Sequence, residues 1–524
     1  MTLAPREIEL KLEVAPTAVS GIKRQLSQVC ANKPIARTLV SVYFDTPRWT
    51  LRKHGMSLRV RRVGRQYVQT LKCAAAPTAG FYDRAQWEHA TTGPKPELSW
   101  TAKPALGALS HGGLAKSLRP VFQTRVRRTE YRLARSGAVI SAALDHGTVR
   151  AGSRHCVLCE VELELSSGSP GALFSVANAL GRNAGTRLCI KTKADRGYEL
   201  LRKMASTAPA PRSLEASPTS TAGEAFQTIA RGCLRQLIAN QDAVLASDGE
   251  ALHRMRIALR RLRTAIRVFS AVVVDSEWSR IKSELRWLAG QLGPARDLDV
   301  FIADVVGPLR EHHAHDREVT RICRAFGLRR ARAYRVLGAS IRSQRYRHLE
   351  LELARWIEVG PWVTSRSGSA PRCRDLPVTL LAAKSLTRWR KNIKKAGRRL
   401  TRLSHRQRHR LRIRGKRLRY AVEFFSGLFP GRKRAKRYGE ILSALVDLQD
   451  SLGALNDLAR REALSSHHAP VTGPKGGPLT EIAPISKAIA MRASLATQGP
   501  RVGQLLNTAK RAYKRFRDVK PFWE

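Results

Sequence analysis

The sequence predicts an α+β protein of more than one domain, with an antiparallel β-sheet in its first two hundred residues and helices from about residue 224 onward. Two patterns support this division. Short stretches of the first part alternate polar and apolar residues, which is typical of strands with two different faces. The second part spaces its apolar residues by three and four, as amphipathic helices do, and it contains an internal repeat.

The first expected strand begins with the string Glu7-Ile8-Glu9-Leu10-Lys11, which places two carboxylates and one ammonium on a single face. Carboxylates can hold a divalent cation between them while a lysine contacts phosphate oxygens. A solvated charged face explains the same string, so it indicates a site only in combination with the segments that follow.

Six further segments continue the alternation: 58–61, 67–72, 84–88, 124–127, 160–165 and 190–193. We expect turns between them, for example at 63–66 and at 145–147. If the sheet curls into a barrel, one face points into a tunnel. Charges on the inside would suit a polyanion held together with a metal ion. The opposite orientation, with aliphatic side chains inside, fits the periodicity equally well.

The order of these pieces resembles the CYTH family, also called triphosphate tunnel metalloenzymes, from about Glu7 to Tyr198. The matching pieces are 7–11, 43–46, 58–61, 70–72, Arg125 with Arg127, 160–164 and 191–198. The resemblance implies an antiparallel β-barrel of eight strands. Its inward charges would bind a triphosphate-bearing substrate together with Mg²⁺ or Mn²⁺.

Matching positions assign the roles that the resemblance implies. The catalytic residues would be Glu7, Glu9 and Lys11. The metal ligands would be Glu7 and Glu9 with one or more of Glu160, Glu162 and Glu164. The phosphate ligands would be Lys11, Arg59, Arg61, Lys72, Arg125, Arg127, Lys191 and Lys193. Gln86 departs from the carboxylate that related triphosphatases often carry, although Glu88 is retained.

The implied reaction is phosphoryl transfer to water. It needs in-line positioning and neutralisation of the charge that spreads over the phosphoryl oxygens. One glutamate of the segment 160–164 could orient the attacking water, and the sequence leaves open which one.

The helical part contains a duplication. The motif that begins at His253 recurs at His409, 156 residues later, and a second motif around Leu292-Gly293 recurs 160 residues later at Leu452-Gly453. A duplicated helical unit is the simplest interpretation.

The first copy of the motif carries two parallel stripes. The apolar stripe is Met255, Leu259, Leu262, Ile266 and Phe269, and the basic stripe is His253, Arg256, Arg260, Arg263 and Arg267. The second copy keeps His409, Arg412, Lys416 and Arg419 before Glu423 interrupts it. A solvated basic face is the simpler interpretation, but the repetition favours a groove for a polyanion.

This part, over about 224–465, resembles the CHAD domain. The resemblance implies two pseudo-symmetric helical bundles whose basic faces turn toward one groove or pore, and it implies binding of inorganic polyphosphate. The contacts would be His253, Arg256, Arg260, Arg263, His409, Arg412, Lys416 and Arg419. Neither histidine has neighbours at zinc-ligand spacing.

We expect a barrel domain at 1–205, a linker rich in Ala, Pro, Ser and Thr at 206–223, and a helical domain at 224–465. Its repeats would span about 224–363 and 377–465, with a loop at 364–376 between them. Residues 466–524 would hold a flexible stretch, to about 480, and a helix from 485 to about 519.

The charge is strongly positive, with 95 Lys and Arg against 41 Asp and Glu, a net charge of +54. Such a chain calls for polyanions and for binding that salt weakens. Aromatic residues make up only 6% of the chain, and no helix-turn-helix or zinc-finger spacing is present, so nucleic acid is expected only as a non-specific ligand.

Eight cysteines without a dense framework favour a reducing cytoplasm, and the pair Cys156 and Cys159 is interpreted as incidental thiols. The first residues lack the apolar run of a signal peptide, and no apolar run is long enough to span a membrane. We therefore expect a cytoplasmic protein, with polyphosphate granules as a candidate location.

The leading hypothesis is a metal-dependent hydrolase of inorganic tripolyphosphate, with the helical domain binding longer polyphosphate. Two alternatives stay open. One is a CYTH enzyme acting on organic triphosphates, as an adenylyl cyclase, a thiamine triphosphatase or a nucleoside triphosphatase. The other is a non-catalytic protein that binds polyphosphate granules. The sequence leaves open the substrate length, the choice between Mg²⁺ and Mn²⁺, the oligomeric state, the effect of Gln86 and the role of the tail.

Overall fold

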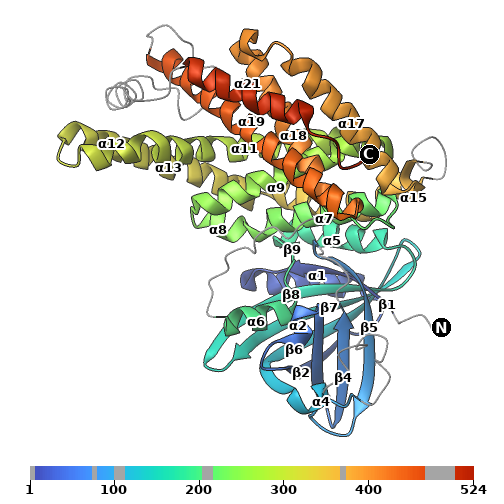
Figure 1. Cartoon of the computed structure of the whole chain (residues 1–524). Coiled ribbons are helices and arrows are strands. Elements are labelled where there is room, and N and C mark those ends of the chain that lie inside the picture. Colours follow the sequence, from blue (N-terminus) through green and yellow to red (C-terminus); the bar gives the residue numbers. More distant parts are fainter. Residues whose placement is uncertain (1–5, 74–78, 99–112, 203–215, 366–372, 466–501) are drawn as a thin grey trace. The chain divides into compact units, whose positions relative to one another are not determined.

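The computed structural model describes residues 6–73, 79–98, 113–202, 216–365, 373–465 and 502–524. The chain forms two compact units (Figure 1). The first contains Met1–Ala208 together with Arg342–Gly360, and the second contains Pro209–Ile341 together with Pro361–Glu524. Most of the expected linker, the middle of the loop expected at 364–376 and all of 466–501 lie outside the described residues.

The first unit is built on a closed β-barrel. Its strands are β1 (Arg6–Glu13), β2 (Ile35–Asp45), β3 (Met56–Val63), β4 (Gln66–Cys73), β5 (Phe81–Thr91), β6 (Arg119–Arg135), β7 (Ala138–Ala151), β8 (Arg154–Ser167) and the short β9 (Arg187–Leu188). Neighbours follow the order β5-β4-β3-β2-β6-β7-β8-β1-β9, and β1 also pairs with β5. All pairings are antiparallel, so eight strands close the barrel, which confirms the predicted fold.

The charges that the alternation groups on β1 lie inside the barrel. Glu7, Glu9 and Lys11 are buried and contact charged side chains from other strands, while Leu10 and Leu12 are buried on the other face of β1. Helix α5 (Gly171–Ala184) packs beside that outer face. Other apolar faces are covered by α1 (Val19–Val29), α2 (Thr50–Lys53) and α4 (Leu114–Ser117). The structure thus selects one of the two orientations that periodicity left open.

The turn expected at 63–66 is confirmed, because β3 and β4 form a hairpin there with Gly64 at a positive φ of 62°. The turn expected at 145–147 is wrong, because those residues lie in the middle of β7. Gly147 serves a different purpose: a Cβ at this position would lie 2.1 Å from the carbonyl oxygen of Arg125 on β6. The two backbones approach too closely for any side chain.

The strand expected at 190–193 is also wrong. Lys193 is the first residue of α6 (Lys193–Leu201), and Thr192 is its N-cap. The Thr192 hydroxyl accepts a hydrogen bond from the amide of Asp195, whose carboxylate in turn accepts one from the Thr192 amide. This capping box starts a helix where alternation predicts a strand.

The second unit is helical. Its helices are α7 (Ala222–Ala239), α8 (Gln241–Leu245), α9 (Gly249–Val268), α10 (Ser270–Val273), α11 (Trp278–Phe301), α12 (Gly307–His312), α13 (Arg317–Arg342), α15 (Pro361–Thr364), α17 (Val378–Gly397), α18 (His405–Phe424), α19 (Arg432–Ser465) and α21 (Val502–Asp518). Helix α14 (Gln344–Val359) groups instead with the first unit, where it contacts α5 and β9. Helix α21 lies within the helix expected at 485–519.

The two copies of the repeated motif form α9 and α18, which contact each other. The expected apolar stripe of α9 is buried, with each of its five side chains at most 3% exposed: Met255, Leu259, Leu262, Ile266 and Phe269. Helix α9 packs on α11, and α18 packs in the same way on α19. Within the described part of the chain, no helix combines the length and apolar character needed to cross a bilayer.

Candidate functional site

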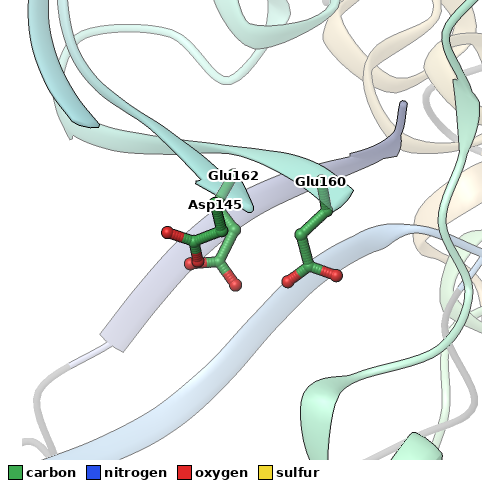
Figure 2. Close-up of side chains that lie close together, drawn as sticks. All are labelled: Asp145, Glu160 and Glu162. Atoms are coloured by element: carbon green, nitrogen blue, oxygen red, sulfur yellow. The ribbon is translucent and has the colours of Figure 1, made fainter. Parts of the chain in front are cut away.

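Three carboxylates meet inside the barrel, from Asp145 on β7 and from Glu160 and Glu162 on β8. One oxygen of each lies within 4.8 Å of the others. Figure 2 shows the three carboxylates gathered on one side of the strands that carry them. Asp145 and Glu160 are fully buried and pair directly across the two strands. An all-oxygen set of this kind suits Mg²⁺ or Mn²⁺.

The ammonium of Lys193 contacts all three carboxylates of this acidic triad. Its Nζ lies 2.7 Å from Asp145, 2.5 Å from Glu160 and 2.8 Å from Glu162. Burial by itself lowers the pKa of Lys193, but the three carboxylates outweigh it and raise the pKa overall. A divalent cation in the triad must therefore share these oxygens with Lys193 or displace it. Glu160 retains one oxygen as a ligand for a cation, because its buried Oε2 has no hydrogen-bond partner among the described residues.

A second acidic pair, Glu7 and Glu9, is held by cations from β4 and β5. Lys72 donates to both oxygens of Glu7, at 2.6 and 2.8 Å, and the Nε of Arg84 donates to Glu7 at 2.9 Å. The Nη2 of Arg84 also pairs with Glu9. Burial raises the pKa of Glu7, but Lys72 and Arg84 outweigh it and lower the pKa to about 2. Arg84 was not among the predicted site residues.

Lys11 links the two acidic groups. Its Nζ lies 2.5 Å from Glu162, 3.7 Å from Glu9 and 4.0 Å from Glu160. Glu164 stands opposite Glu9 across β1 and β8. Burial, and then the charges of nearby carboxylates, raise the pKa of Glu164. The tunnel therefore brings together all five glutamates predicted as metal ligands and adds Asp145.

Two arginines of β3 face the tunnel and make no ion pair among the described residues. Arg61 donates from Nε to the hydroxyl of Ser41 at 3.2 Å. Burial, followed by the charges of Arg59 and Arg128, lowers its pKa to about 9. The buried Nε of Arg59 has no hydrogen-bond partner in the described part of the chain. Buried cations that repel one another are stabilised by a bound anion.

Two predicted phosphate ligands lie elsewhere. Arg125 and Arg127 are exposed on the outer face of β6, and their neighbour Arg128 points inward. Arg128 donates to Asp145 at 2.8 and 2.6 Å and also to Glu162. Since neighbouring strand residues face opposite sides, inward Arg128 requires outward Arg127.

The sequence contained a signal for Arg128 in the next few residues. Positions 128, 130 and 132 are charged, while 131 and 133 are apolar and buried. The missed Asp145 is a lone carboxylate in a largely apolar stretch, which the neighbouring glycine made look like a turn. Lys191 also lies apart from the triad, because its Nζ pairs with Glu199 on α6 at 2.9 Å.

The position that departs from the family pattern is near the tunnel wall. Gln86 pairs with Lys72 across β4 and β5, and its buried Oε1 has no hydrogen-bond partner among the described residues. Glu88 is more exposed and accepts a hydrogen bond from the hydroxyl of Thr70 at 3.0 Å.

In the helical unit, equivalent arginines each donate to a backbone carbonyl of the neighbouring helix in the two repeats, although the two acceptor positions do not correspond. Arg256 on α9 donates to the carbonyl of Leu292 at 3.0 Å, and Arg412 on α18 donates to the carbonyl of Gln449 at 3.4 Å. The repeated glycines lie beside them. A Cβ on Gly453 would lie 3.2 Å from the guanidinium of Arg412. The duplicated Leu-Gly pairs therefore leave room for an arginine against the neighbouring helix.

The positive charges of the basic stripes on α9 and α18 repel one another. Burial lowers the pKa of Lys416 to about 8, helped by Arg412 and Arg419 on its own helix and by Arg260 on α9. Burial and nearby arginines also lower the pKa of His253 and of His409. Among the predicted contacts, Arg419 differs by pairing with Glu423 at 3.3 Å.

Comparison with known proteins gives two adjoining matches. The family model of the CYTH domain matches residues 5–198, and that of the CHAD domain matches residues 228–465. An inorganic triphosphatase of Haemophilus influenzae is 28% identical over 197 residues, which are 37% of this chain and 55% of that protein. The chain thus spans about half the length of this relative.

Two other relatives differ in how much of the chain they cover. An uncharacterized protein of Mycobacterium tuberculosis is 26% identical over 477 residues, 85% of this chain and 86% of its own. A crystal structure of the CHAD domain from the plant Ricinus communis is 26% identical, with a TM-score of 0.46, and covers 59% of this chain and 97% of that chain.

Proposed function

The chain belongs to the proteins that join a CYTH domain, here at residues 5–198, to a CHAD domain, here at 228–465, and from this premise we propose that it hydrolyses inorganic tripolyphosphate in its barrel and binds longer polyphosphate on its helical unit. One observation carries the proposal. Arg59 and Arg61 face the same tunnel as the buried carboxylates but make no ion pair among the described residues. They are the cations that a phosphate chain would neutralise.

The phosphate oxygens would be bound by side chains from several strands. Arg59 and Arg61 on β3 would contribute guanidinium N–H groups that bind no carboxylate. Lys72 on β4 and Lys11 on β1 would contribute ammonium groups that contact the carboxylates of Glu7 and Glu162. Burial strengthens the attraction between these cations and a phosphate chain, because the low dielectric of a dry interior reduces screening. Such a cage neutralises the charge that spreads during phosphoryl transfer and holds the chain in line for attack by water.

The carboxylates fit the divalent cation that this kind of domain implies. Asp145, Glu160 and Glu162 would hold Mg²⁺ or Mn²⁺, with Glu7 and Glu9 as the neighbouring acidic pair. When bound, the ion would draw charge from the phosphate oxygens and lower the pKa of a water bound to it. Lys193 would then be released from the triad to bind phosphate oxygens instead.

The choice of an inorganic substrate is supported by the Haemophilus relative, which carries the name inorganic triphosphatase. Polyphosphate binding by the helical unit is supported by the shared field of α9 and α18, where Arg260 and Lys416 repel each other from different repeats. Such a field favours a long anion that can contact both repeats at once.

The test is phosphate release from tripolyphosphate by the full chain with Mg²⁺ or Mn²⁺, measured beside ATP and thiamine triphosphate and repeated with EDTA. Glu160→Gln removes one carboxylate of the triad and should lower the rate by roughly 100-fold or more. Glu440→Gln is the matched control, because Glu440 is exposed on α19.

Each outcome of this experiment selects one function. Fast release from tripolyphosphate that EDTA and Glu160→Gln abolish supports the proposal. Faster release from ATP or thiamine triphosphate would replace the inorganic substrate with an organic one. No release from any triphosphate, with tight polyphosphate binding retained, would leave a non-catalytic protein of polyphosphate granules.

A further inference from the structure

The outside of the barrel carries a patch of basic side chains that the tunnel does not use. It consists of six exposed residues on β3, β6, β7 and β8, here called the outer basic patch: Arg62, Arg125, Arg127, His146, Arg150 and His155. Arg125 and Arg127 are the two arginines that the sequence placed in the tunnel. In the structure, both side chains lie on the outer face of the barrel instead.

The strand register makes the patch continuous. Arg127 stands directly opposite His146, while Arg150 pairs with His155 on one side and with Gln123 on the other. Arg62 and Arg125 both pair with the same residue of β2, Val40. Neighbouring strands lie about 4.8 Å apart, so the four steps from β3 to β8 span about 19 Å.

Among the residues that the structure describes, no carboxylate shares this surface with the patch. The outward residues between its members are Thr38, Val40, Gln123, Thr148 and Val157. Arg125, Arg127, His146 and His155 make no hydrogen bond or ion pair through their side chains within the described ranges. Arg62 and Arg150 each donate from Nε only to a nearby glycine carbonyl, at 3.0 and 3.1 Å.

A surface of one sign costs stability. Like charges that face each other across neighbouring strands repel, and solvated strand faces usually mix the two signs. The alternation that sends Arg128 and Asp145 into the tunnel sends Arg127 and His146 outward. The patch is therefore a second cationic surface, separated from the tunnel by the barrel wall.

We propose that the outer basic patch binds an extended chain of inorganic polyphosphate along the outside of the barrel. The choice of ligand rests on the proposed function, because polyphosphate is the polymer of the same phosphoanhydride unit. The surface itself favours this ligand over single-stranded nucleic acid, since neither the patch nor the residues between its members include a Phe, Tyr or Trp side chain, the larger rings on which bases stack.

The test compares two double variants of the full chain in binding to fluorophore-labelled long-chain polyphosphate. Arg125→Gln/Arg127→Gln removes two charges from the patch. Lys23→Gln/Arg24→Gln removes two exposed charges from α1, outside the patch. We expect the first variant to raise Kd roughly three- to thirtyfold at low salt, from two exposed charge contacts. The slope of log Kd against log salt should become shallower by about 1.4.

Hydrolysis of tripolyphosphate should be the same in both variants and the wild type. An equal loss of polyphosphate binding in the α1 variant, or no loss in either, would overturn the proposal. A loss that is as large for a DNA oligonucleotide would assign the patch to nucleic acid instead. Absence of hydrolysis in the wild type would refute the proposed function and leave this binding comparison intact.

Discussion

Replacing Lys193 with Met removes the only ammonium that contacts all three carboxylates of the acidic triad in the described structure. The three N–O distances are between 2.5 and 2.8 Å, and Asp145 and Glu160 are fully buried. Removing one partner of a buried ion pair costs about 3–5 kcal/mol, because the remaining charge stays uncompensated. Arg128 still contacts Asp145 and Glu162, and Lys11 still contacts Glu162, so we expect the lower end of this range, about 3 kcal/mol, for the barrel.

Urea unfolding in EDTA measures this cost through the midpoint of the barrel transition. Lys191→Met is the matched control. It removes the same charge two residues earlier, but Lys191 pairs with Glu199 in partial contact with solvent, and such pairs contribute about 0–1 kcal/mol. Adding Mn²⁺ should stabilise Lys193→Met more than the wild type, because the cation no longer competes with the ammonium. Equal midpoints for the two variants in EDTA, or equal stabilisation by Mn²⁺, would refute the assigned role of Lys193.

Two other predictions concern the barrel backbone and the helical groove. Gly147→Ala places a Cβ 2.1 Å from the carbonyl oxygen of Arg125, so β6 and β7 must separate, and the barrel should lose about 3 kcal/mol or more in urea unfolding; an unchanged midpoint would contradict the close approach. Lys416, whose pKa falls to about 8, is charged below that pH and neutral above it. Polyphosphate affinity should therefore decrease as pH rises through about 8, and Lys416→Arg should remove that step from the pH profile; a step that persists would assign it to another group.

The alternation of residues revealed which side chains share a face, but the direction of each face depends on the closed sheet. Glu7, Glu9 and Lys11 were correctly grouped, and so were Glu160, Glu162 and Glu164. Whether such a group lines a tunnel or meets solvent is decided by what covers its other side, such as α5 beside β1. This is long-range packing, and no local pattern contains it.

Errors arose where short-range signals competed. Gly147 resembles a turn residue, yet a glycine is required there by the close approach of Arg125 on β6, 22 residues earlier in the chain. Lys193 continues an alternating string, yet the capping box of Thr192 and Asp195 turns the chain into a helix. The apolar stripe of α9 was predictable because residues spaced by three and four lie on one face of a helix, and that face is the buried one.

The opposite directions of Arg127 and Arg128 give β6 an unusual sensitivity to changes in length. The barrel wall here is a single layer of strands, with Arg127 on its outside and Arg128 on its inside. Insertion or deletion of a single residue in the preceding part of the strand would exchange the two sets of side chains. An insertion would bring Arg127 into the inward position of Arg128, whereas a deletion would bring Thr129 there, and the carboxylates of Asp145 and Glu162 would then lose their guanidinium. Changes of two residues preserve the pattern of inward and outward side chains.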